Sequence, residues 1–145
     1  MIRRYRSRIS QPILDRIDLY INVDKIDFNE LNNEQANESS EDIRKRVERV
    51  VQVQAQRYRK LDINFNSQLG AGQIRRFCKL GSSERDLLEE AFERIGLSAR
   101  GYHRILRVAR TIADMDGAEN ISCTHIAEAL GYRDNTGTEE VGIRI

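Results

Sequence analysis

The chain has 145 residues, a formal net charge of +1 and two cysteines. So small a net charge excludes a globally basic nucleic-acid binder, and two cysteines are too few for a disulfide framework. No apolar run approaches the roughly 20 residues of a membrane-spanning helix, and no signal-peptide core follows Met1, so a cytoplasmic protein is expected. One proline and nine glycines disfavour a turn-rich β-sandwich or barrel, so helices are expected to dominate.

Charge is unevenly distributed at the start of the chain. Residues 1–18 hold five arginines against two aspartates, whereas residues 24–42 hold seven acids against one lysine. Residues 29–40 are acidic and rich in asparagine, a composition typical of a mobile linker. The basic and acidic stretches therefore indicate separate roles for the two segments.

An alternating segment lies between these stretches. Apolar residues recur at every second position, the period of a half-buried strand: Ile17, Leu19, Ile21 and Val23. One strand is not stable alone, and nothing later in the chain resembles a partner for it. We therefore expect residues 1–27 to be the tail of a core domain whose remainder lies outside this chain.

Five helices are predicted after the linker, each from a cap residue and a stretch of 3.6-residue periodicity. They are a long helix opened by Ser39 and Ser40, a short one over 71–77, one opened by Ser82 or Ser83 and stopped by Gly96, one from Ser98 to about Asp116, and one from Ser122 to Gly131. The expected inward residues of the first and third are Ile43, Val47, Val50, Val51, Tyr58 and Leu61, and Leu87, Leu88, Ala91, Phe92 and Ile95.

These elements predict an all-α fold, a small bundle of four to five helices preceded by an extended N-terminal segment. The expected organisation is a core remnant with the linker at 1–38, the helical domain at 39–133 and a disordered tail at 134–145.

The Ser98 helix carries the strongest chemical signal. Its apolar residues share one face, and four arginines share the other: Arg100, Arg104, Arg107 and Arg110. Arg100 falls in the first turn, where free backbone N–H groups and the helix dipole favour an anion such as phosphate. The alternative is a solvated basic face paired with neighbouring glutamates, which the pattern alone favours.

No metal site or catalytic triad is predicted. Cys78, His103, Cys123 and His125 match no zinc spacing; the cysteines are expected to be buried thiols and the histidines to have no preferred partner. The chain has no G-x-x-x-x-G-K-[ST] phosphate-binding loop, since none of its nine glycines precedes a lysine. We therefore expect this chain to be unable to hydrolyse a nucleotide unaided.

Three stretches together resemble a known family. YRSRISQPILDRID at 5–18 resembles the segment of magnesium-chelatase-type AAA+ ATPases that ends in a Leu-Asp-Arg arginine-finger motif. GLSARGYHRILRVARTIAD at 96–114 closely resembles the lid helix of the ComM/YifB subfamily, and IAEALGYR at 126–133 is similar to its last helix. The order and spacing of the three stretches match as well.

This resemblance implies a lid domain from a homo-hexameric ring that binds ATP with Mg between its subunits. Arg16 would be the arginine finger, which reaches the neighbouring subunit's ATP and stabilises charge on the γ-phosphate. Arg100 would be the sensor arginine, which contacts ATP in its own subunit; Arg104 and Arg107 match that role less directly. The subfamily is linked to DNA processing, so DNA is a further expected partner.

Two alternatives remain open at this point. A helical nucleic-acid-binding module would lay the Ser98 helix along phosphates and bind DNA with steep salt dependence. A non-enzymatic protein-interaction domain would depend on neither Arg16 nor Arg100.

Overall fold

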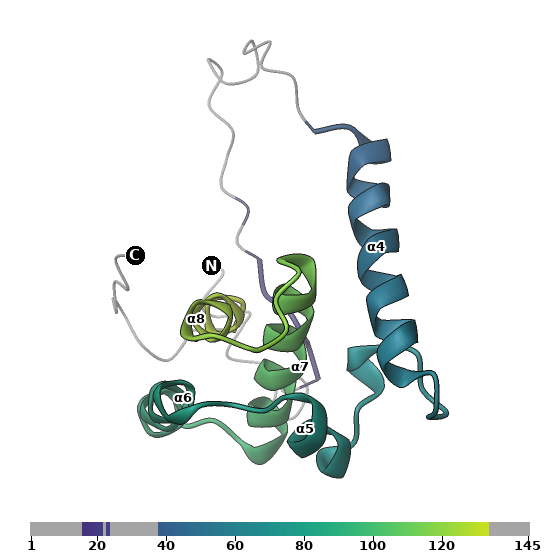
Figure 1. Ribbon diagram of the computed structural model, residues 1–145. Coiled ribbons are helices and arrows are strands. Elements are labelled where there is room, and N and C mark those ends of the chain that lie inside the picture. The colour runs from purple at the N-terminus through teal and green to yellow at the C-terminus, as the bar shows by residue number, and fades with distance from the viewer. Residues whose placement is uncertain (1–15, 22, 24–37, 134–145) are drawn as a thin grey trace, which may run out of the picture.

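The computed structural model describes residues 16–21, 23 and 38–133, and this part of the chain is all-helical, with no strand. It holds five α-helices and one 3-10 turn, which follow one another without a repeat (Figure 1). They are α4 (Ser40–Tyr58), η1 (Asn66–Gln68), α5 (Ala71–Phe77), α6 (Ser82–Ile95), α7 (Ala99–Met115) and α8 (Cys123–Gly131). The predicted all-α fold is confirmed.

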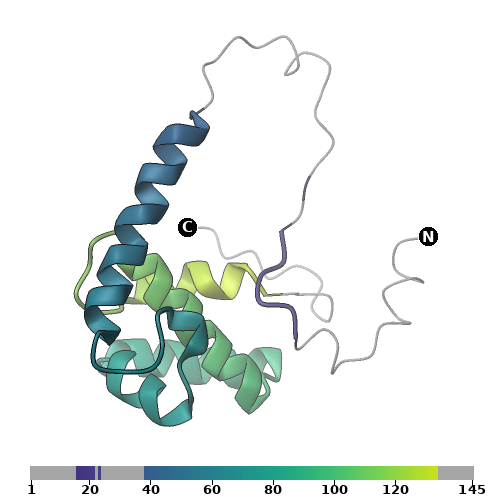
Figure 2. The ribbon, with the colours of Figure 1, turned by 90° about the vertical axis from the view of Figure 1, so that its right-hand side faces the viewer.

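Helix α7 is the centre of the bundle. It packs against α8, α4, η1 and α5, and α6 reaches the bundle through α8 (Figures 1 and 2). The core is built from the apolar face of α7 together with side chains of the other α-helices and of the residue after η1, among them Tyr58, Leu69, Ile74, Leu88, Ile105, Leu106, Ala109, Ala113, Ile126 and Ala129. Apart from α6, which packs on α8, the other elements are therefore placed by how they pack on α7.

The predicted helix ends are confirmed at most positions. Ser39 and Ser98 cap α4 and α7, each accepting a hydrogen bond from the backbone N–H three residues on. Gly96 ends α6 in the left-handed region at φ 65°, which a glycine adopts without strain. The expected cap of α6 is wrong: Gly81 is the N-cap residue, and Ser82 is already helical.

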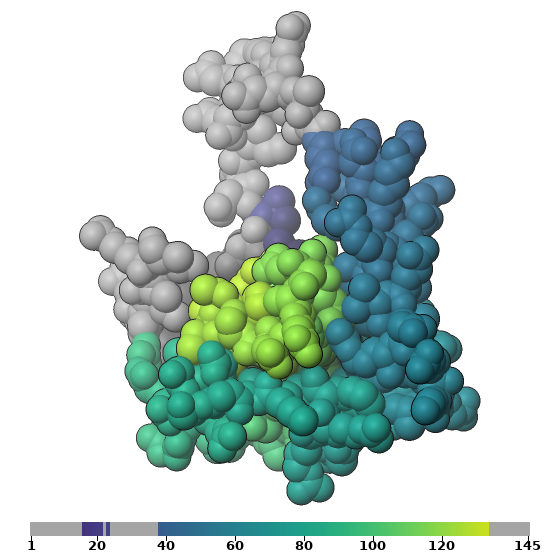
Figure 3. All heavy atoms as spheres, in the orientation of Figure 1, coloured from purple at the N-terminus to yellow at the C-terminus, as the bar shows by residue number. Residues whose placement is uncertain are grey.

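The first half of α4 stands away from the bundle. The expected inward residues Ile43 and Val47 of this half are 42% and 48% exposed, and Val51, just past the middle of the helix, is 39% exposed. Only Val50, Gln54 and Tyr58 of this helix are buried, and all three lie in its second half, the part that runs beside the bundle (Figure 1). The space-filling view shows the first turns of α4 rising above the level of α7 and α8 (Figure 3).

Two inward assignments on α6 are also wrong. Phe92 and Ile95 are 40% and 36% exposed, while Leu88 and Ala91 are buried. The Phe92 ring instead packs edge-on against Tyr102, with the ring centroids 6.3 Å apart. The helix therefore turns a narrower apolar stripe towards the core than its sequence indicates.

The predicted strand is not present in residues 16–21 and 23. These residues follow an irregular path, and Ile17, Leu19, Ile21 and Val23 are exposed. The Tyr20 N–H donates to the carbonyl of Tyr132, 2.9 Å away, at the end of α8. Within the described part of the chain, the segment at this helix end meets no neighbouring strand whose backbone N–H and C=O groups could pair with its own, so these residues form no β-sheet. The expected tail at 134–145 lies outside the described residues.

In the described part of the chain, no helix combines the length and apolar character that a membrane span requires.

Candidate functional site

Arg100 lies in the first turn of α7, one residue after Ala99 begins the helix. Ser98 Oγ accepts the Gly101 N–H at 3.0 Å, and the Ser98 carbonyl accepts the Tyr102 N–H at 2.9 Å. No acidic residue stands in this first turn, and Arg100 is exposed. Within residues 16–21, 23 and 38–133, its guanidinium has no ion pair. Arg100 therefore projects a positive charge beside a helix N-terminus.

Arg104, one turn further along α7, is engaged by the N-terminal segment. Its side chain is 10% exposed, and its Nη1 donates to the Ile17 carbonyl at 2.8 Å. Its Nε forms an ion pair with the Asp18 carboxylate. The expected basic face is thus turned towards the protein at this position.

Arg107 and Arg110 are also bound to protein groups. Arg107 is half-buried, and its Nε donates to the Leu69 carbonyl at 3.0 Å. Arg110 donates to the carbonyls of Ala118 and Glu119, at 2.6 and 2.8 Å, beyond the end of α7. The interpretation of a solvated basic face is therefore wrong for three of the four arginines, because neighbouring loops cover that side of the helix.

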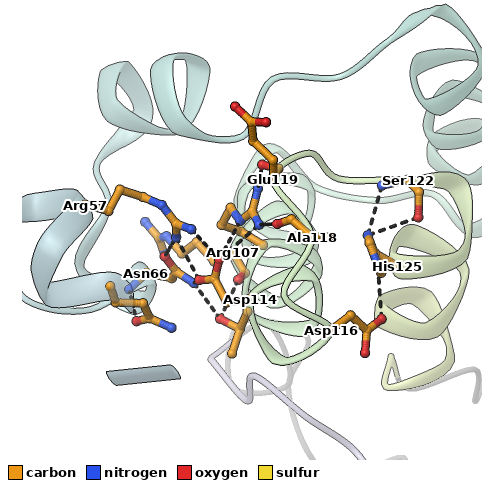
Figure 4. Close-up of polar contacts among 12 residues, drawn as sticks. Arg57, Asn66, Arg107, Asp114, Asp116, Ala118, Glu119, Ser122 and His125 are labelled. Carbon is orange, nitrogen blue, oxygen red and sulfur yellow. Dashed lines mark hydrogen bonds and ion pairs between the residues drawn. The ribbon is translucent and has the colours of Figure 1, made fainter. Parts of the chain in front are cut away.

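A buried polar cluster fixes α4 and η1 onto α7 (Figure 4). Arg57 binds both carboxylate oxygens of Asp114, with Nη1 at 2.7 Å from Oδ2. Asn66 Nδ2 donates to the same Oδ2 at 2.9 Å, and Arg110 Nε donates to Oδ1 at 3.1 Å. The Tyr58 hydroxyl completes the cluster by donating to Asn66 Oδ1 at 2.5 Å.

The charges in this cluster are stabilised despite their burial. Burial alone raises the pKa of Asp114, but hydrogen bonds from Arg57 and Asn66 and the charge of Arg110 outweigh it, so its pKa lies below the ordinary value. The hydrogen bond to Asp114 raises the pKa of Arg57 in turn. Both groups are therefore ionised at neutral pH, and the cluster is a structural anchor without an open ligand position.

Arg16 lies at the start of the described chain. It is exposed, and its side chain makes no hydrogen bond or ion pair with the other described residues. Arg16 and Asp18 form no ion pair with each other; Asp18 pairs with Arg104 instead. Arg16 therefore directly precedes Ile17, whose carbonyl accepts a hydrogen bond from Arg104, and the Arg16 side chain is exposed to solvent.

His125 has partners that the sequence did not indicate. Its Nδ1 lies 3.0 Å from both the backbone N and the Oγ of Ser122, and its Nε2 lies 3.1 Å from Asp116 Oδ2 (Figure 4). Because Nδ1 accepts the Ser122 N–H, Nε2 carries the ring proton and donates it to Asp116. The Nδ1 lone pair is thus occupied by the α8 cap, and the three residues form no nucleophile–base pair.

The cysteines differ from one another. Cys78 is buried in the core, and burial raises the pKa of its thiol to about 11. Cys123 is only half-buried and donates to Glu84 at 3.4 Å, so the expectation of a buried thiol is wrong at this position. Among the described residues, no group of His, Cys, Asp or Glu side chains could hold a metal ion.

A hollow of about 500 Å³ lies between α6 and α7, beside the first turn of α7. Phe92, Tyr102 and His103 line it together with the carboxylate-bearing side chains Glu89 and Glu93. Arg85 also lines the hollow, but two carboxylates against one guanidinium leave its lining net negative, which disfavours the phosphates of a nucleotide, so the hollow is not assigned to ATP.

Fold and site together define an all-helical domain organised around one arginine-rich helix. Residues 37–133 match the family model "Magnesium chelatase, subunit ChlI C-terminal", and residues 1–31 match "Magnesium chelatase, subunit ChlI". The chain therefore belongs to the magnesium chelatase family, to the C-terminal region of its ChlI subunit type.

Several curated proteins are similar over nearly the whole chain. The Competence protein ComM of Haemophilus influenzae is 44% identical over 91% of this chain, and the uncharacterized protein YifB of Escherichia coli is 39% identical over 90%. An uncharacterized protein of Mycobacterium bovis is 32% identical over 90%. The matches cover 25%, 25% and 26% of those relatives, so the chain spans about a quarter of their length.

Proposed function

We propose that this chain is the lid-bearing C-terminal part of a magnesium-chelatase-like AAA+ ATPase related to ComM. In the complete protein it contributes a finger arginine, Arg16, and a sensor arginine, Arg100, to ATP sites in a homo-hexameric ring. The observation that supports this most strongly is the different environment of Arg100. Three arginines of α7 are bound to protein groups, whereas Arg100 is exposed at the helix N-terminus.

Arg100 has the chemistry that a phosphate requires. A guanidinium offers a planar fork of hydrogen-bond donors to phosphate oxygens. The adjacent helix N-terminus adds backbone N–H groups, which also favour an anion. Contact with the terminal phosphate would make the position of α7 depend on which nucleotide is bound. The lid would then close over ATP and open after hydrolysis.

Arg16 suits action on a neighbouring subunit. It is exposed and precedes a backbone carbonyl that Arg104 fixes, so it extends from an anchored segment. An arginine supplied in trans stabilises charge on the transferred phosphoryl group and is worth about 10³- to 10⁵-fold in rate in other nucleotide hydrolases. The neighbouring subunit's ATP would therefore be hydrolysed only within an assembled ring.

Magnesium would be held outside the described residues. Since these residues offer no acidic cluster for a metal, the ATP phosphates and the rest of the protein would supply its ligands. The chain by itself is expected to release no phosphate from ATP.

Work on DNA is the further part of this proposal. It is supported by the relative named a competence protein and by the resemblance to a subfamily linked to DNA processing. The separate hypothesis of a DNA-binding module built on α7 has little support, because Arg104, Arg107 and Arg110 bind protein groups. DNA contact by the complete ring would therefore use other surfaces.

The test is ATP hydrolysis by the complete protein, with this chain joined to its ATPase core. Arg16→Ala should lower the steady-state rate by about 1,000-fold or more, the lower limit for finger arginines in other nucleotide hydrolases, and Arg100→Ala should also lower it. Arg75→Ala removes an equal charge from an exposed position on α5 and serves as the matched control. Normal hydrolysis by both variants would refute both assigned roles and would favour the protein-interaction domain, which depends on neither arginine.

A further inference from the structure

The N-terminal segment is attached to the lid helix through Arg104. This side chain is nearly buried, yet two groups that it contacts lie 86 and 87 positions away in sequence: the Asp18 carboxylate and the Ile17 carbonyl. One guanidinium makes both contacts: Nη1 donates to the carbonyl, while the carboxylate lies at ion-pair distance from Nε without accepting a hydrogen bond from it. A lysine has a single nitrogen and could not make both contacts with the same geometry.

A second bond fixes the same segment to α8. The Tyr20 N–H donates to the Tyr132 carbonyl at 2.9 Å, directly after the last residue of α8. Residues 17–20 are thus held at two places by two helices that pack on each other. A displacement of these two helices would therefore displace residues 17–20 as well.

We propose that Arg104 is a positioning residue that joins the finger arginine to the lid. It lies one helical turn after Arg100, and the carbonyl it holds belongs to the residue after Arg16. A displacement of α7 by a nucleotide at Arg100 is therefore transmitted through Arg104 to Arg16. This inference rests on the proposed function, but the attachment itself can be tested without any nucleotide.

The attachment depends more on the backbone bond than on the ion pair. Asp18 is 66% exposed, so solvent screens its attraction for the guanidinium and an exposed pair is worth little. The Ile17 carbonyl instead accepts a charged donor that is shielded from water. Loss of Arg104 should therefore release the segment more completely than loss of Asp18.

The first test follows hydrogen exchange at the Tyr20 amide in the complete protein, without nucleotide. Arg104→Ala should accelerate this exchange about tenfold, the scale of one lost hydrogen bond to a charged group. Arg107→Ala is the control, since it removes a guanidinium–carbonyl contact to Leu69 on the same helix and should leave Tyr20 protected. Unchanged exchange in Arg104→Ala would overturn the proposed attachment.

The second test is kinetic. If Arg104 sets the position of Arg16, Arg104→Ala and Arg104→Lys should lower kcat by about 10- to 100-fold, the cost of misplacing a catalytic group by about 1 Å. KM for ATP should stay within about twofold, because the variants alter neither Arg100 nor the ATPase core. The Arg104→Ala/Asp18→Ala double variant should be no slower than Arg104→Ala, as expected for two groups acting through one contact.

The outcomes separate this inference from the proposed function. If Arg16→Ala abolishes hydrolysis while Arg104→Ala retains normal kcat and a protected Tyr20 amide, the finger role stands and the coupling is wrong. If Arg104→Ala releases Tyr20 but Arg16→Ala hydrolyses ATP normally, the attachment stands and the finger role is wrong. An equal loss of kcat in Arg107→Ala would mean general damage to the lid and would also overturn the coupling.

Discussion

Replacing Asp114 with alanine should strongly destabilise the helical domain of this chain. The substitution leaves two guanidiniums without their carboxylate, those of Arg110 and Arg57, whose side chains are 3% and 20% exposed. Removing one partner of a buried ion pair costs about 3–5 kcal/mol in other proteins. Because whole domains are stable by only about 5–15 kcal/mol, this is a large share of the total.

The assay is urea unfolding of the purified chain, followed by circular dichroism. Asp114→Ala should move the midpoint to a much lower urea concentration, and Asp114→Asn should do so less because it retains the shape and one acceptor oxygen. Asp86→Asn on the exposed side of α6 is the matched control and should change the free energy of unfolding by less than about 0.5 kcal/mol.

The pH dependence follows from the lowered pKa of Asp114. A carboxyl whose pKa is depressed by folding contributes stability above its unfolded pKa, about 4, and this contribution is lost as pH falls through the folded pKa. The difference between the wild type and Asp114→Asn should therefore be constant near neutrality and shrink below about pH 4. A difference that is small at pH 7, or that grows on acidification, would refute the assigned role of Asp114.

Two further predictions concern a helix cap and a buried thiol. Ser98→Ala should lower the free energy of unfolding by about 1 kcal/mol, because it removes the hydrogen bond from the Gly101 N–H. Ser82→Ala should cause no such loss, because Gly81 is the N-cap residue of α6. Equal losses of stability for the two variants in urea titrations would contradict this prediction. Burial raises the pKa of the Cys78 thiol to about 11, so Cys78 should resist a thiol reagent at pH 8 until the chain unfolds. The half-buried Cys123 should react first. Rapid modification of Cys78 in the native Cys123→Ser variant would show that the Cys78 thiol is not buried.

Local signals were sufficient for most of the helical domain. The caps at Ser39 and Ser98 and the stop at Gly96 depend on neighbouring residues in the chain, so the sequence alone predicts them correctly. Burial was predicted less well, since periodicity shows which residues share a face but not whether another element covers it. Ile43 and Val47 share the apolar stripe of α4 yet extend beyond the reach of α7.

In the candidate site too, the sequence indicates which residues share a helix face but not which of them another element covers. A helical wheel places four arginines on one face of α7, but whether solvent or protein meets that face depends on contacts distant in sequence. Arg104 is bound by residues 17 and 18, and Asp114 is bound by Arg57 and Asn66, at sequence separations between 48 and 87. Those partners carried no local signal, so the distinction between Arg100 and its neighbours required the fold.

The central claim, that Arg16 acts on a neighbouring subunit's ATP, is tested most directly by mixing two inactive forms of the complete protein. One form carries Arg16→Ala, and the other has an intact Arg16 but a disabled phosphate-binding loop in its ATPase core. If the finger acts in trans, mixed rings should recover part of the ATPase activity that neither form has alone, and the recovery should vary with the mixing ratio. No recovery in rings shown to contain both forms would contradict the account.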